Sequence, residues 1–71
     1  MNASTRRELL RVLEEISLEN LDVRLGQLIV NLSYLARGPA VESPWDVEDE
    51  ELLQAAKKHL EGLRSRHASV A

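Results

Sequence analysis

The sequence contains no cysteine and no phenylalanine, and its only aromatic residues are Tyr34 and Trp45. Without cysteine, a disulfide framework and a thiolate metal site are both excluded. With so few aromatic rings, the hydrophobic core has to be aliphatic and mostly leucine. A single core in a chain of 71 residues supplies only a few kcal/mol of net stability, so we expect a second subunit to be the remaining source of stabilisation.

Long apolar runs are also missing. No segment approaches the roughly 20 apolar residues that cross a bilayer, and no basic start followed by an apolar stretch marks a signal peptide. We therefore expect a cytoplasmic protein that does not contact a membrane. Hydrophobic residues make up 44% of the chain and charged residues 30%, which is typical of one folded domain spanning residues 1–71 rather than of a disordered segment.

Apolar residues recur at helical spacing in three stretches, near 5–17, 22–37 and 47–65, which predicts an all-α fold. The inner face of the first helix is formed by Leu9, Val12, Leu13 and Ile16. That of the third is formed by Leu52, Leu53, Ala56, Leu60 and Leu63. Residues 66–71 lack a periodic apolar position, and we expect them to form a frayed tail.

The second stretch is apolar on two sides. Its wide face contains Leu25, Leu28, Ile29, Leu32, Leu35 and Ala36, and Val23 and Val30 lie nearly opposite. A helix that is apolar on two sides is usually enclosed by others, so we predict that the second helix is central. The short connection before it predicts that the first and second helices are antiparallel neighbours, and Gly38 followed by Pro39 predicts where the second helix ends.

Gly26 interrupts this otherwise strong helical pattern. A glycine inside a helix costs about 1 kcal/mol relative to alanine, so either another backbone approaches it closely or it is merely tolerated at the surface. Gly26 shares a narrow strip with Val30 and Ser33. That strip could receive a helix of the same chain or of a second copy.

A polar stripe on the same helix consists of Arg24, Gln27 and Asn31. It is either a recognition surface or a set of side chains that satisfy polar groups of a neighbouring loop, and the second interpretation is favoured. We predict that Arg24 pairs with a carboxylate among Asp46, Glu48 and Asp49, and that Gln27 or Asn31 bonds to the backbone near Trp45. A lone tryptophan in a small aliphatic protein most often anchors a loop on the core, which we expect of Trp45 in preference to an exposed binding role.

No residue pattern indicates an enzyme, a metal centre or a cofactor. The acidic residues 46–51 lack the spacing of a calcium loop and are explained by the start of a helix, with Asp46 as the best N-cap. His59 and His67 do not form a zinc or di-iron motif. Neither a nucleophile elbow nor a phosphate-binding glycine loop is present.

Two motifs together resemble a set of small uncharacterised bacterial proteins. The motifs are the stretch Arg24-Leu-Gly-Gln-Leu-Ile-Val-Asn31 and the stretch Trp45-Asp-Val-Glu-Asp-Glu-Glu-Leu52. The resemblance covers about residues 20–60. No established activity comes with it, but it implies that the polar stripe is coupled to the segment from Trp45 to Asp49.

These observations favour a non-enzymatic module for protein–protein interaction or self-association. Its partner is expected to be a second copy, giving a homodimer, or another protein, docked through the strip of Gly26, Val30 and Ser33 or a neighbouring apolar patch. The alternative is a small regulatory protein that binds nucleic acid through Arg6, Arg7 and Arg11. Net charge argues against the alternative, because it is -3 overall and the excess of acids lies after residue 37.

Overall fold

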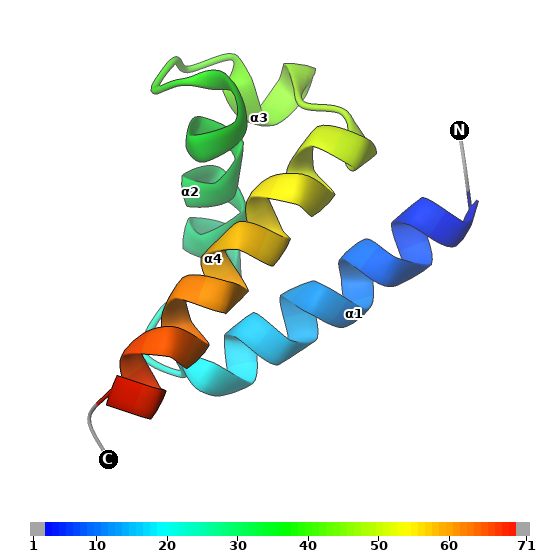
Figure 1. Ribbon diagram of the computed structural model, residues 1–71. Coiled ribbons are helices and arrows are strands. Elements are labelled where there is room, and N and C mark those ends of the chain that lie inside the picture. Colours follow the sequence, from blue (N-terminus) through cyan, green and yellow to red (C-terminus); the bar gives the residue numbers. More distant parts are fainter. Residues whose placement is uncertain (1–2, 70–71) are drawn as a thin grey trace.

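The structure is a computed structural model that describes the backbone of residues 3–69 and the side chains of residues 3–66. It contains the helices α1 (Ala3–Glu19), α2 (Leu25–Arg37), α3 (Ser43–Asp46) and α4 (Asp49–Ser69) (Figure 1). No strand occurs within residues 3–69, so the all-α prediction is confirmed for this part of the chain. The three long helices correspond to the three predicted ones, and α3 is an additional helical turn inside the expected loop.

The helix ends differ from those predicted. The first helix spans Ala3–Glu19. It is longer than predicted because no glycine or proline interrupts it. The second begins only at Leu25, because the preceding residues form a turn in which the Val23 amide donates to the Asn20 carbonyl at 3.2 Å. The last helix continues to Ser69 and so includes residues 66–69, which we expected to be frayed. Residues 70–71 of that predicted tail lie outside the described residues.

The central helix is α4, not α2. Figure 1 shows α4 running between α1 and α2, and it packs against both, whereas α1 and α2 make little contact with each other. The predictions that α2 is central and that α1 lies along α2 are therefore wrong. With 21 residues, α4 is long enough to offer one apolar stripe to both partners, so the short α1–α2 turn does not dictate which helices pack.

The core is a single aliphatic cluster contributed by the three long helices. Its buried residues are Leu9, Val12, Leu13, Ile16, Leu28, Leu32, Leu52, Leu53, Ala56, Leu60 and Leu63. The predicted inner faces of the first and third helices are confirmed residue for residue. The predicted face of the second is not, because only Leu28 and Leu32 of its six members are buried. This incomplete burial leaves apolar side chains of α2 in contact with solvent.

Ion pairs on the described part of the chain join α4 to both of its neighbours. Toward α1, Asp49 pairs with Arg6 at 3.0 Å, Lys57 with Glu8 at 2.8 Å and Arg64 with Glu15 at 2.8 Å. Toward α2, Glu51 pairs with Arg37 at 2.9 Å. Such exposed pairs contribute little individually, and their regular spacing along α4 mainly sets the register of the helices.

The carboxylate of Glu51 also accepts the backbone N–H of Glu48 at 3.1 Å, which caps the first turn of α4. This cap replaces the one we predicted at Asp46, which is instead the last residue of α3. The hydrogen bond from the Glu48 amide lowers the pKa of Glu51 most, and the hydrogen bond from the Arg37 guanidinium lowers it further. The pKa of Glu8 is lowered chiefly by a hydrogen bond from Lys57.

Acidification should therefore destabilise the fold. A carboxyl whose pKa is lowered by folding contributes stability above its unfolded value, near 4.5, and this contribution is lost as pH falls through the lower folded value. We expect the Glu51→Gln variant to melt at a lower temperature than wild type at pH 7. Its melting temperature should then fall less than that of wild type when the pH is lowered to 3.5. The control Glu42→Gln should keep the wild-type pH dependence, because Glu42 forms no ion pair with the described residues. Equal pH dependence in all three proteins would contradict this role of Glu51.

The predicted stop of α2 at Gly38 is confirmed. Gly38 has φ 99° and ψ 163°, and its amide donates to the Tyr34 carbonyl at 2.7 Å. The Gly38 carbonyl accepts the hydroxyl of buried Ser43 at 2.7 Å, which ties α3 to the end of α2. The backbone conformation at Gly38 is one that essentially only glycine adopts.

The Gly38→Ala substitution should destabilise the protein by roughly 1–3 kcal/mol, because alanine is strained at this φ and ψ. Gly62→Ala is the matched control, since Gly62 lies inside α4 with open space where a Cβ would be added. The control should stabilise the protein by about 0.5–1 kcal/mol. Urea unfolding measures both, and a Gly38→Ala protein as stable as wild type would show that this conformation is not required.

Candidate interaction surface

Several large apolar side chains of this small protein lie in solvent. They are Leu10, Leu18, Leu21, Leu25, Leu35, Val41 and Trp45. Scattered apolar residues on a surface need no explanation, but a contiguous group indicates a binding surface. Three of these leucines, Leu10, Leu18 and Leu25, surround one depression, and Leu21 lies in the turn between the helices that form it.

This depression is the α1–α2 groove, an open hollow of about 390 Å³. It is lined chiefly by Leu10, Leu13, Glu14, Leu18, Leu25 and Ile29. None of the described α4 side chains, up to residue 66, lines it, because α4 packs on other faces of α1 and α2. The groove therefore exists because α1 and α2 diverge from their connecting turn without packing closely together (Figure 1).

Exposure within the α1–α2 groove is graded from floor to rim. Leu13 is buried and Ile29 is half-buried, whereas Leu10, Leu18 and Leu25 are 61%, 68% and 58% exposed. A hydrophobic floor with exposed leucines at the rim matches the surface that receives the apolar face of a helix. The α1 residues that line the groove include Leu10, Glu14 and Leu18. These follow one another at intervals of four residues, so they lie on one side of the helix.

One charged side chain lines the α1–α2 groove, namely Glu14 on its α1 wall. The α2 wall consists of Leu25 and Ile29, and Arg24, the N-cap residue before Leu25, is not one of the lining residues. Glu14 and Arg24 are both exposed, and neither takes part in an ion pair among residues 3–66. These charges are therefore available to a bound partner.

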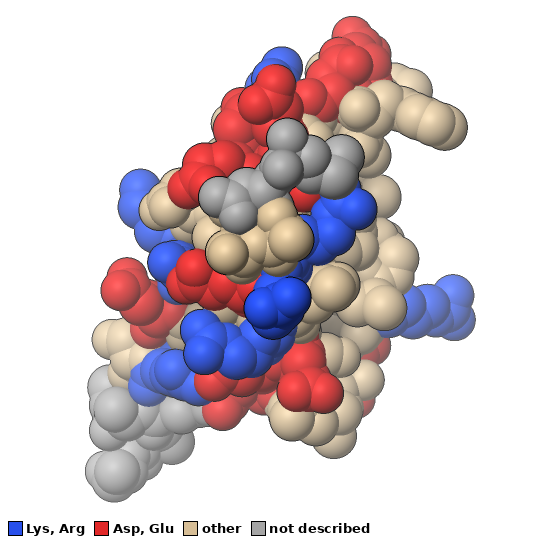
Figure 2. Space-filling model, turned by 90° about the vertical axis from the view of Figure 1, so that its right-hand side faces the viewer, with Lys and Arg blue, Asp and Glu red and all other residues tan. Residues whose placement is uncertain are grey.

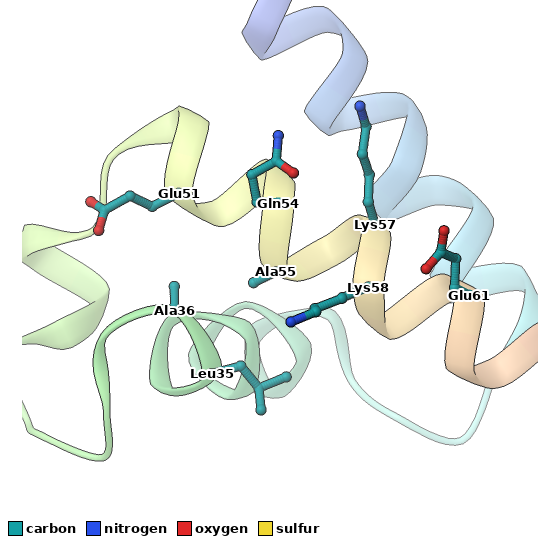
Figure 3. Close-up of a pocket in the computed structure, with 8 residues that line it drawn as sticks. All are labelled: Leu35, Ala36, Glu51, Gln54, Ala55, Lys57, Lys58 and Glu61. Carbon is teal, nitrogen blue, oxygen red and sulfur yellow. The ribbon is translucent and has the colours of Figure 1, made fainter.

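A second hollow, of about 580 Å³, lies between α2 and α4. Figure 3 shows Lys58 and Leu35 at the space between the two helices, while Lys57 extends away from it. The ammonium of Lys57 is engaged by Glu8, and the carboxylate of Glu51 by Arg37 and the Glu48 amide. Because much of its charge is already committed within the molecule, this hollow is a weaker candidate than the α1–α2 groove.

Trp45 does not anchor the loop, contrary to our expectation. It is 87% exposed, and the side chain that pins the segment is Ser43. Residues two positions apart in a helix point in nearly opposite directions, so burial of Ser43 turns Trp45 outward. Figure 2 shows carboxylates gathered at the upper end of the molecule, where Figure 1 places α3 and the start of α4. Exposed Trp45 and Asp46 therefore share the acidic end of the fold.

The predicted strip of Gly26, Val30 and Ser33 is not a continuous surface. Gly26 is exposed and has open space where a Cβ would be added, so within the described chain no other backbone approaches it, and of the two interpretations a glycine tolerated at the surface fits better. Ser33 is fully buried, and its hydroxyl donates to the Val30 carbonyl at 2.7 Å. A partner helix cannot lie along a strip whose last member is inside the protein.

The predicted coupling between the polar stripe and the acidic segment is also wrong. Arg24 lies at the start of α2, whereas α3 follows the end of α2, about 20 Å away for a helix of 13 residues. Asp49 pairs with Arg6 instead. The side-chain amide of Gln27 donates to the Asn31 side-chain oxygen at 2.8 Å, so this bond stays within α2 and does not reach the backbone near Trp45.

The basic residues of α1 are partly neutralised within the molecule. Arg6 is paired with Asp49, and Arg11 lies 4.0 Å from Glu8. In Figure 2, basic and acidic side chains alternate across the middle of the visible face rather than forming a uniform basic patch. Nucleic-acid binding through Arg6, Arg7 and Arg11 stays an untested prediction that these contacts do not favour.

Among residues 3–66, no group of three or more histidine or acidic side chains is arranged to hold a metal ion. None of the helices in the described chain is both long and apolar enough to cross a bilayer. Comparisons with protein-family models, curated proteins and solved structures found no match. The resemblance to small bacterial proteins stays a prediction, and the α1–α2 groove is the feature of this structure that best fits a binding surface.

The exposure of Trp45 can be tested by substitution. We expect Trp45→Ala to change the free energy of unfolding by less than about 0.5 kcal/mol, because the ring has few contacts to lose. Leu32→Ala, at a fully buried site, should cost about 2–5 kcal/mol. Chemical denaturation followed by circular dichroism measures both without relying on tryptophan fluorescence. A loss above about 2 kcal/mol for Trp45→Ala would restore the anchor interpretation.

Proposed function

We propose that this protein is a non-enzymatic interaction module that docks an apolar helix in the α1–α2 groove. The observation that carries this proposal is the exposure of Leu10, Leu18 and Leu25 around one hollow that the described residues of α4 leave uncovered. Keeping these leucines in water is unfavourable, and a docked helix would remove them from it. Each rim leucine would contribute roughly 1–2 kcal/mol on burial.

The lining of the α1–α2 groove supports binding rather than catalysis. Its single ionisable lining group is Glu14, which lies at the exposed rim and has no base or nucleophile paired with it among the described residues. Catalytic sites combine several polar groups at fixed distances in a sheltered cavity. Here apolar side chains dominate, and they fit the i, i+4 ridge of a partner helix.

A model helix tests the docking. The protein, labelled at its leucine and isoleucine methyl groups, would be titrated with an amphipathic peptide of Leu, Ala, Glu and Lys that carries leucines at i, i+4 and i+8. We expect the NMR signals of Leu10, Leu18, Leu25 and Ile29 to shift, while those of the buried core residues Leu53 and Leu60 stay in place. Leu18→Gln should weaken peptide binding roughly tenfold, which corresponds to about 1.4 kcal/mol.

Leu35→Gln is the matched control. Leu35 is about as exposed as Leu18 but lies in the hollow between α2 and α4. The control should bind the peptide like wild type. The proposal fails if Leu35→Gln weakens binding as much as Leu18→Gln, or if the shifts map to the hollow between α2 and α4.

A further inference from the structure

Val41 and Trp45 expose apolar surface at a second place on the molecule, away from the α1–α2 groove. They are 84% and 87% exposed, and neither lines that groove. Exposed tryptophan side chains are typical anchors of protein interfaces, because one ring offers a large apolar area with few rotatable bonds. The side chain that holds this segment on the fold is Ser43 rather than Trp45. The indole ring is therefore available to a partner without loss of the fold.

The backbone that carries this tryptophan is held in one conformation. The Asp46 amide donates to the Glu42 carbonyl at 3.0 Å, which closes the single turn of α3. The buried Ser43 hydroxyl donates to the Gly38 carbonyl at 2.7 Å and ties this turn to the end of α2. An anchor that is ordered before binding loses less conformational entropy when a partner docks.

The charges around Trp45 have one sign. Residues 38–56 contain no lysine or arginine, and their six acidic residues are Glu42, Asp46, Glu48, Asp49, Glu50 and Glu51. Figure 2 shows carboxylates gathered at the upper end of the molecule, where Figure 1 places α3 and the start of α4. The exposed tryptophan therefore lies in a negative field.

These acidic side chains differ in whether the molecule already uses them. At the start of α4, Asp49 pairs with an arginine of α1 and Glu51 with an arginine of α2. We name the other group the α3 carboxylates, and it consists of Glu42, Asp46 and Glu48. Each is exposed, lies within three residues of the tryptophan and forms no ion pair among residues 3–66. The start of α4 does not account for these charges, which remain available to a cation from outside.

We propose that Trp45 and the α3 carboxylates bind a basic segment of another protein, with an arginine of that segment stacked on the indole ring. Charge complementarity selects this occupant, because a guanidinium is attracted to the face of the ring and can donate to a flanking carboxylate at the same time. Nucleic acids and anionic lipid surfaces carry the opposite charge and would be repelled. This contact goes beyond the helix docked in the α1–α2 groove and does not depend on it.

The fluorescence of Trp45 tests the proposal directly, because the chain has no other tryptophan. The probe is a short capped peptide of alternating arginine and alanine, compared with peptides in which neutral citrulline or lysine replaces every arginine. We expect the arginine peptide to change the emission in a saturable way. The citrulline peptide should bind at least about tenfold more weakly, and the lysine peptide about threefold more weakly, because an ammonium stacks less well than a planar guanidinium.

Substitutions assign the binding to this surface. The variant Glu42→Gln/Asp46→Asn/Glu48→Gln keeps the tryptophan signal and should weaken binding of the arginine peptide roughly tenfold. Trp45→Leu, measured by calorimetry, keeps an apolar side chain without a π face and should weaken binding roughly fivefold. Trp45→Phe should recover part of that loss. Circular dichroism verifies that each variant is folded.

The matched control is Glu14→Gln/Asp22→Asn/Glu61→Gln. It removes the same three negative charges at exposed positions outside α3, none of which forms an ion pair among the described side chains. It should bind the arginine peptide like wild type. Leu18→Gln, which alters the α1–α2 groove, should also bind it like wild type, so that failure here is distinguishable from failure of the proposed docking function.

Three results would overturn the inference. One is an emission that does not respond to millimolar arginine peptide. Another is equal binding of the arginine and citrulline peptides, which would identify an apolar rather than a basic occupant. The last is an emission that changes with protein concentration alone while light scattering shows association, which would identify a second copy of the chain as the occupant of Trp45.

Discussion

The fold depends on the packing of one aliphatic stripe of α4 between α1 and α2. Ala56, in the middle of that stripe, is fully buried, and this small residue allows close approach of the neighbouring helices. Leucines on either side of it complete the contact. The ion pairs of α4 with Arg6, Glu8, Glu15 and Arg37 then hold the long helices in register. Because α4 satisfies the main apolar faces of both partners, α1 and α2 need not pack on each other.

The α1–α2 groove is a direct consequence of that arrangement. Two helices joined by a short turn normally close on one another, and here they remain apart because each is already packed on α4. Leucines that would have met across a closed hairpin are left at the rim of an open hollow. The same physical cause therefore explains the fold, the unusual exposure of apolar side chains and the site at which we propose that an apolar helix docks.

Sequence periodicity predicted the long helices and the buried residues of α1 and α4 well, because the inner face of each of those helices is one continuous apolar stripe that has to face the core. It failed for α2. We interpreted its two apolar sides as a sign that other helices enclose it. The sequence does not say which apolar positions meet another helix and which remain in solvent. Trp45 was misplaced because its direction depends on Ser43, whose hydrogen bond to the Gly38 carbonyl is a tertiary contact. The groove had one signal in the sequence, namely that Leu10 and Leu18 lie outside the inner face of their helix.

The accessibility of α2 on its α1 side tests this account most directly. The chain has no cysteine, so single introduced cysteines can be labelled cleanly with a thiol reagent at a low protein concentration that disfavours association. We predict that Leu18→Cys and Leu25→Cys react at nearly the rate of a cysteine in a short peptide. Leu28→Cys and Leu32→Cys should react roughly a hundredfold more slowly, because they require local opening of the core. If the Leu25→Cys protein reacted as slowly as the Leu28→Cys protein, α1 would cover α2, and the central position of α4 with its open groove would be contradicted.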